Sequence, residues 1–254
     1  MTDLGLKEMT MQKNRRRTRG AWARRLAGAA GLVASAAALA APVAYTDRAA
    51  FDAATAGMHR TVENFDALPS GTPITSGDAL GGLALTYNLG GVSLAVTDGT
   101  AFGGGALPFA TTSPGNFLGT DDGDMLQDGD GFTVQLGAAN AFGLYLISAD
   151  PLWDGDFLLT AGGIGASLWT GDLQAHFPGD GSSVYFLGIV DADAPLWAAT
   201  LATDHDMATG QFLWNADDLV VARASQVPEP ASLGLFALGM AALTARRRFT
   251  PSTI

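Results

Sequence analysis

The sequence predicts an all-β fold: an antiparallel two-sheet sandwich of jelly-roll type with a short N-terminal helix. Apolar and polar residues alternate in segments such as 132–136 and 142–146, which is the period of a strand with one buried face. The connections between these segments are short and rich in Asp, Gly, Ser and Pro, as in antiparallel sheets. Little Lys or Glu occurs between the two ends of the chain, which argues against long helices.

The predicted helix opens the domain. Thr46 is expected to cap it, and Ala49, Phe51 and Ala54 recur at helical spacing before Gly57 ends it. Nine strands are expected to follow, at residues 61–66, 83–87, 92–96, 132–136, 141–147, 157–160, 184–190, 196–201 and 212–222. The expected β-sandwich domain therefore spans residues 45–222, with no helix between its strands.

The N-terminal segment has the order of an export signal. Residues 13–25 are basic, residues 26–41 are almost entirely small or apolar, and Ala38-Leu39-Ala40 offers the small-x-small pattern that a signal peptidase accepts. An amphipathic surface helix would need a polar face, which this stretch lacks. The sequence predicts a signal peptide at residues 1–40, cut before Ala41 and directing export.

The C-terminal segment, residues 223–254, is expected to be a separate tail. Pro228-Glu229-Pro230 precedes the apolar residues 231–245, and Arg246, Arg247 and Arg248 follow directly. As a helix the apolar residues would extend about 22 Å at roughly 1.5 Å per residue, so snorkelling arginines and local thinning would be needed to cross a bilayer core of about 30 Å. The sequence predicts a single transmembrane helix at 231–245, anchored in the inner membrane with its arginines on the cytoplasmic side.

This order of motif, apolar helix and arginine cluster resembles the PEP-CTERM sorting signal, although Phe249 to Ile254 continue past the arginines. The resemblance implies processing by an exosortase, a membrane enzyme that cuts near Pro228-Glu229-Pro230, with the three arginines as stop signal. It also implies a Gram-negative bacterium that makes exopolysaccharide and lives in biofilms. The protein is then expected to pass from a membrane-anchored intermediate to the cell surface or extracellular matrix.

The charge of the central region excludes one class of partner. In the central region, residues 41–225, three arginines (Arg48, Arg60 and Arg223) stand against 22 acidic residues, a formal net charge of −19. Such a surface repels phosphates, so nucleic acid is not an expected partner. The chain has no cysteine, which excludes disulfides and thiolate chemistry.

Calcium is the cofactor that the acidic residues suggest. The densest cluster comprises Asp121, Asp122, Asp124, Asp128 and Asp130, interleaved with glycines. Carboxylates on a flexible loop suit the six to eight oxygen ligands of Ca²⁺. The alternative is that the Asp-Gly pairs only form solvated turns. A second, thinner group comprises Asp150, Asp154 and Asp156.

Tryptophans suggest carbohydrate as the ligand. Trp153, Trp169, Trp197 and Trp214 lie in the predicted sandwich, and exposed aromatic rings stack on sugars, although the same residues could pack the core. No hydrolase signature appears, and His205 between Asp204 and Asp206 is better explained as a solvated loop than as an acid–base group. The expectation is a non-enzymatic surface or matrix protein that binds exopolysaccharide. The alternatives are a secreted carbohydrate-active hydrolase and a structural coat or adhesion protein without a discrete ligand site.

Overall fold

The computed structural model describes residues 41–75, 79–80, 82–89, 92–100, 110–122, 125–203 and 212–225. The predicted signal peptide at 1–40, the Pro-Glu-Pro motif and the predicted membrane helix at 231–245 lie outside these residues. Among the residues that the structure describes, no helix has the length and apolar character needed to cross a membrane.

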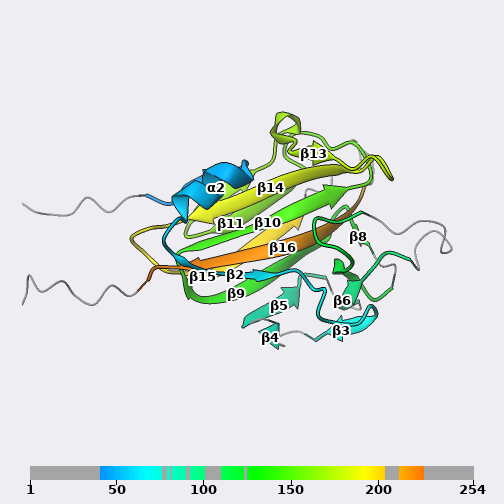
Figure 1. Cartoon of the computed structure of the whole chain (residues 1–254), viewed down its shortest axis with the longest axis horizontal. Coiled ribbons are helices and arrows are strands. Elements are labelled where there is room, and N and C mark those ends of the chain that lie inside the picture. Colours follow the sequence, from blue (N-terminus) through cyan, green and yellow to red (C-terminus); the bar gives the residue numbers. More distant parts are fainter. Residues whose placement is uncertain are drawn as a thin grey trace, which may run out of the picture. The chain divides into compact units, whose positions relative to one another are not determined.

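Two antiparallel sheets make up the described domain (Figure 1). In the described residues, sheet A has ten strands: β1 (Val43–Tyr45), β14 (Ser183–Val190), β10 (Ala141–Ser148), β16 (Leu213–Arg223), β7 (Phe117–Thr120), β6 (Leu94–Thr97) and β3 (Thr72–Ile74) in spatial order, with β13 (Ala175–His176) beside β14 and both β2 (His59–Glu63) and β8 (Leu126–Gln127) beside β16. Sheet B has six there: β12 (Ile164–Ser167), β11 (Phe157–Ala161), β15 (Leu196–Thr203), β9 (Gly131–Ala139), β5 (Leu83–Tyr87) and β4 (Ala79–Leu80).

The chain crosses repeatedly between the sheets, as in a jelly roll. From β9 onward it passes from sheet B to β10 in sheet A, back to β11 and β12, then to β14, β15 and β16 in turn. The inward side chains form one core between the layers, in which Phe132, Leu144, Leu187 and Trp214 are buried. The predicted two-sheet sandwich is confirmed.

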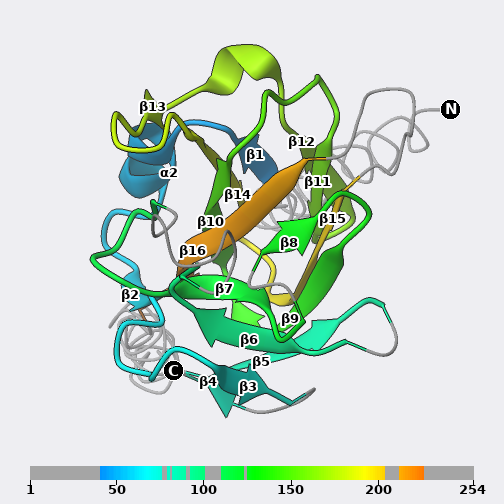
Figure 2. The same cartoon turned by 90° about the vertical axis from the view of Figure 1, so that its right-hand side faces the viewer.

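The helix α2 (Arg48–Ala54) lies on the outer face of sheet A, over β14 (Figure 2). Its N-cap is Asp47, whose carboxylate accepts a hydrogen bond from the Ala50 amide at 2.6 Å. The prediction that Thr46 caps the helix is therefore wrong. Thr46 lies one residue too early to reach this amide, and its hydroxyl donates instead to Asp172 Oδ1 at 2.9 Å. A 3₁₀ turn, η1 (Thr170–Asp172), is the other helical element of the described residues.

Candidate functional site

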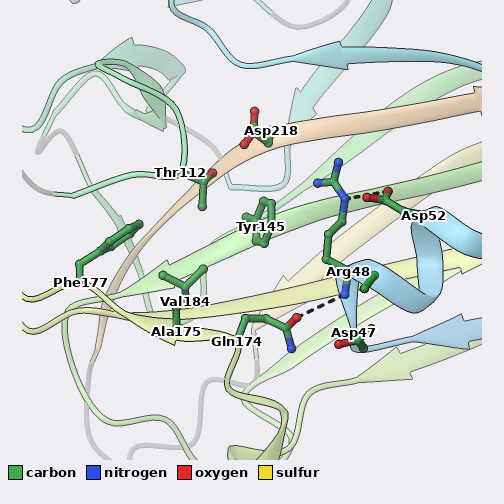
Figure 3. Close-up of a pocket in the computed structure, with 11 residues that line it drawn as sticks. Asp47, Arg48, Asp52, Thr112, Tyr145, Gln174, Ala175, Phe177, Val184 and Asp218 are labelled. Atoms are coloured by element: carbon green, nitrogen blue, oxygen red, sulfur yellow. Dashed lines mark hydrogen bonds and ion pairs between the residues drawn. The ribbon is translucent and has the colours of Figure 1, made fainter.

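A pocket of about 540 Å³ opens on the outer face of sheet A, beside α2 (Figure 3). The residues around it come from α2, β10, β13, β14, β16 and the segment before β7. They are Asp47, Arg48, Ala49, Asp52, Thr112, Tyr145, Gln174, Ala175, Phe177, Val184 and Asp218. The pocket therefore gathers residues that lie up to 171 positions apart in the sequence, and it exists only in the folded domain.

Two facing glycines bring α2 to the pocket. Gly143 on β10 and Gly188 on β14 are paired directly across the strands. A Cβ at Gly188 would lie 2.6 Å from Phe51 Cδ2, and one at Gly143 would lie 2.6 Å from Phe186 Cζ. These distances are too short for any side chain, so the glycine pair forms the slot in which the Phe51 ring packs. The buried Phe51 then fixes Arg48, one turn earlier in α2.

Arg48 is held from three sides. Its Nε donates to Asp52 Oδ1 at 2.9 Å, and its guanidinium carbon lies 5.2 Å from the centre of the Tyr145 ring and 5.4 Å from that of Phe186. A cation over an aromatic face at this distance is attracted by the ring. Asp52 also pairs with Arg60, so this carboxylate serves two arginines.

Gln174 ties the β13 region to the start of α2. Its side-chain oxygen accepts from the Arg48 amide at 3.3 Å, and its side-chain nitrogen donates to the carbonyls of Thr46 at 3.2 Å and Asp172 at 3.0 Å. Both the oxygen and the nitrogen of the Gln174 amide group are thus hydrogen-bonded within the protein. Gln174 shapes the wall of the pocket rather than offering a free amide to a ligand.

A β-bulge points Asp218 toward the pocket. Gly143 pairs with Val220 and Tyr145 with Asp217, so two residues of β16 stand opposite one residue of β10. Asp218 has a φ of 47°, a left-handed conformation that is uncommon outside glycine. Bulges and strained residues of this kind frequently redirect a side chain at a functional site. Figure 3 labels Asp218, Tyr145 and Thr112 among the residues that line the pocket.

Asp217, the residue before Asp218, binds the loop that contains Thr112. Its carboxylate is fully buried and accepts hydrogen bonds from the Thr111 hydroxyl, the Thr112 hydroxyl at 3.1 Å and the Ser113 amide at 2.8 Å. Burial raises the pKa of Asp217 to about 6, against the lowering effect of these hydrogen bonds. Asp217 thus connects this loop to β16, the strand that also contains Asp218.

The pocket offers the mixture of groups that a polyol requires. Burial raises the pKa of the Tyr145 phenol, which keeps its O–H as a donor, and the Thr112 hydroxyl both donates and accepts. Asp218 supplies acceptor oxygens, while the Tyr145 and Phe177 rings supply apolar surface. The sequence pattern did not identify Arg48, Gln174 or Asp218 as site residues. Two adjacent carboxylates inside an expected strand, at 217 and 218, were the one available signal.

The four candidate tryptophans do not form one platform. Trp153, Trp169 and Trp197 are 59%, 59% and 65% exposed, whereas Trp214 is fully buried. Trp214 packs edge-on against Phe157 at 5.0 Å between ring centres, and its indole N–H donates to the Gln127 carbonyl at 2.9 Å. Its assignment as a sugar-stacking residue is therefore wrong, because β16 is a central strand whose inward residues are covered by sheet B.

The exposed tryptophans lie at two ends of sheet B. Trp153 and Trp169 occupy neighbouring loops, which are joined where the Thr170 amide donates to Asp154 Oδ1 at 2.7 Å. Trp197 lies near the start of β15, where a bulge interrupts its pairing with β9. The loops with Trp153 and Trp169 adjoin the start of β11, which pairs with the far end of β15. A single ligand ring cannot stack on all three.

The Asp residues of the predicted calcium cluster have different surroundings. Asp121 accepts from the Ser93 amide at 3.0 Å. Asp130 accepts from the Tyr87 hydroxyl and the Gln127 amide, each at 2.6 Å. Asp128 is buried and Asp122 exposed. Asp124 lies outside the described residues, and no group of three or more His or acidic side chains placed to hold a metal occurs within them. Calcium binding stays a prediction.

The thinner acidic group is used in loop hydrogen bonds. Asp150 Oδ2 accepts from the Leu213 amide at 3.1 Å, Asp154 Oδ1 from the Thr170 amide and hydroxyl, and Asp156 Oδ2 from the Trp153 amide at 2.6 Å. These carboxylates organise the loops beside β11. His205 lies outside the described residues.

Comparison with known proteins identifies one region of the chain. Residues 226–248 match the PEP-CTERM protein-sorting motif, which contains the predicted Pro228-Glu229-Pro230, the apolar segment and Arg246 to Arg248. No significant match was found among curated proteins or among solved structures. The chain thus carries the PEP-CTERM motif of an exported protein that an exosortase sorts and processes.

Proposed function

We propose that this is a non-enzymatic protein of the cell surface or extracellular matrix, whose β-sandwich binds exopolysaccharide in the pocket beside α2. A signal peptidase removes residues 1–40, and the helix at 231–245 holds the exported intermediate in the inner membrane until an exosortase acts. The producing cell is then a Gram-negative, exopolysaccharide-forming bacterium. The sorting motif at 226–248 supports export and processing by an exosortase, and the pocket beside α2 supports a polysaccharide ligand.

The observation that carries the ligand class is the strained Asp218 beside the Tyr145 ring. A φ of 47° at a non-glycine residue costs free energy, and it occurs within the bulge at which Asp218 joins Tyr145 in the lining of the pocket. Sugars present apolar ring faces and hydroxyl groups together, so a ring and an acceptor side by side match them. The volume of about 540 Å³ is in the range of small-ligand sites.

The roles of the three carboxylates in the pocket favour binding of a sugar over its hydrolysis. Glycoside hydrolysis in its usual form requires two carboxyl groups across one bond. In this pocket Asp47 caps α2 and Asp52 is paired with Arg48 and Arg60. Both therefore have roles in the fold, and Asp218 is left as the carboxylate suited to a ligand.

A glycan array probed with the exported protein tests the proposal. Asp218→Asn keeps the left-handed backbone, which Asn also tolerates, and removes the charge. Tyr145→Ala removes the ring. Each is expected to weaken binding by about tenfold or more, while Asp193→Asn, the same change on an exposed loop, leaves it unchanged.

Two results would replace the proposal with its alternatives. Release of reducing sugar by the native protein, lost in Asp218→Asn, would identify a carbohydrate-active hydrolase. Binding to no glycan would identify a coat or adhesion protein without a discrete ligand site. Binding that neither pocket variant affects would show that the pocket is not the ligand site.

A further inference from the structure

The outer face of sheet B carries a row of threonines across four neighbouring strands. Thr86 on β5 pairs with Thr133 on β9, Thr133 with Thr200 on β15, and Thr200 with Thr160 on β11. The Thr133 and Thr200 hydroxyls lie 3.0 Å apart. Because neighbouring strands are about 4.8 Å apart, the four side chains form a regular line, which we call the threonine row.

The strands around the threonine row contain no charged residue. All six described strands of sheet B consist of apolar residues, Gly, Thr, Ser, Gln and one Tyr, although residues 41–225 include 22 acidic residues. Outward positions next to the row are small or uncharged, such as Ala198, Gln135 and Ala202. A face of this composition, in so acidic a domain, cannot be explained by solubility alone.

Apolar side chains are exposed on the same face. Trp197 is 65% and Leu158 42% exposed. Their chain neighbours Leu196 and Leu159 are buried in the core, so both side chains point away from it. A shallow groove of about 630 Å³ runs over β11, β12 and β15 between Leu158, Thr160 and Thr200. The face thus combines a row of hydroxyls with a groove and an exposed indole.

We propose that the outer face of sheet B binds a chain of neutral polysaccharide. Hydroxyls spaced at the strand interval can exchange hydrogen bonds with successive sugar units, and the indole of Trp197 can stack on a ring. The absence of charge on the face means that no ionised group loses water when an uncharged chain covers it. This surface lies on the sheet opposite the pocket and does not depend on it.

Charge distinguishes a neutral polysaccharide from the other molecules that could cover this face, namely a second copy of the protein, an anionic glycan or a nucleic acid. Exposed carboxylates border the face, with Asp154 in the loop before β11 and Asp193 in the loop before β15. Two copies meeting face to face would bring these like charges together. Anionic glycans and nucleic acids meet the same repulsion. A neutral glycan meets none. Within the row the Thr160 hydroxyl donates to the Thr200 carbonyl at 3.3 Å and the Thr133 hydroxyl to Asn88 Oδ1 at 3.4 Å, and a hydroxyl that donates within the fold can still accept from a sugar hydroxyl.

A pull-down with the full exported protein tests the proposal, with microcrystalline cellulose and a soluble neutral β-glucan as probes and alginate as the anionic comparison. We expect saturable binding to at least one neutral probe and none to alginate. The double variant Thr133→Val, Thr200→Val keeps the β-branched shape and removes two hydroxyls. It and Trp197→Ala should each weaken binding by about tenfold.

Matched controls separate this surface from the pocket. Thr61→Val and Val62→Ala make comparable changes on β2 of sheet A and should bind as the native protein does. Asp218→Asn should also retain neutral-chain binding, so failure of the pocket leaves this result intact. Circular dichroism and melting temperature confirm that each variant is folded.

Three outcomes would overturn the proposal. The first is no binding of the native protein to either neutral probe. The second is unchanged binding in folded Trp197→Ala and the double valine variant. The third is self-association of the native protein that Trp197→Ala abolishes in sedimentation, which would make a second copy the occupant.

Discussion

Asp217 is the residue whose ionisation connects most directly to the stability of the domain. Its carboxyl group is fully buried, and burial raises its pKa from 3.8 to about 6. Between these two values the folded state binds more protons than the unfolded state, so the free energy of unfolding falls as the pH rises. The loss is about 3 kcal/mol for a shift of this size.

Asp217→Asn removes this pH dependence. Relative to the native protein, the variant is expected to gain about 2 kcal/mol in unfolding free energy between pH 4 and pH 7, since part of the change already lies below pH 4. Urea titration at both pH values measures it. Asp122→Asn changes the net charge equally at an exposed position and reports the contribution of charge alone. A stability difference that stays constant with pH would contradict this account of Asp217.

Individual residues also show the limit of pattern analysis. The sequence places Trp214 and Trp197 in the expected strands 212–222 and 196–201, but does not show what covers either side chain. Trp214 faces the core between the sheets, and Trp197 faces solvent. Asp218 has its role because of a bulge, and a bulge depends on the partner strand, which the local sequence does not specify.

At the scale of elements, all nine predicted strands are present. The expected segment 83–87 coincides with β5, and the expected 141–147 corresponds to β10 (Ala141–Ser148). Strands such as β7 (Phe117–Thr120) and β12 (Ile164–Ser167) were not predicted. β7 is buried on both faces and too short to show alternation. β12 has four residues, three of them small, and follows a glycine turn.

The docking of α2 depends on Gly188. In Gly188→Ala the new Cβ would lie 2.6 Å from the Phe51 ring, so α2 must shift outward, at a cost of about 1–3 kcal/mol in unfolding free energy. Amide hydrogen exchange at Phe51 and Thr55, whose N–H groups donate to Asp47 and Phe51, should become faster.

Gly171→Ala is the matched control for that change. Nothing lies within 4 Å of the position that its new Cβ would occupy, so its effect should stay within about 0.5 kcal/mol. Equal stability of the two variants, with unchanged exchange in α2, would show that the glycine slot does not hold the helix. Loss of glycan binding to the pocket in Gly188→Ala alone would tie the slot to the site.

At the scale of the whole molecule, we expect the tail to decide where the domain resides. Removal of residues 228–254 deletes the predicted helix and its arginines. We expect the truncated protein in the medium and the full-length protein in the membrane fraction of a host without an exosortase, because about 15 apolar residues favour the bilayer. Equal amounts of both proteins in the medium, measured by fractionation and immunoblotting, would show that the tail is no anchor.

The Pro-Glu-Pro motif is expected to govern processing rather than insertion. Replacing Pro228, Glu229 and Pro230 by Ala leaves the apolar segment intact, so membrane association should persist. In a host with a functioning exosortase the variant should keep its tail, which mass spectrometry detects as a heavier product. A mature mass identical to that of the native protein would exclude these residues from recognition.

The sequence by itself determined the fold class and the sorting address of this protein, because both are encoded locally. Alternation with a period of two reports a half-buried strand wherever it occurs, and the PEP-CTERM motif occupies contiguous residues, 226–248. Only the tertiary structure decided which side chains share a surface. The pocket unites Arg48, Tyr145 and Asp218, and the threonine row unites four strands. Strand pairing sets these neighbours, and pairing depends on long-range register and packing that no local pattern contains.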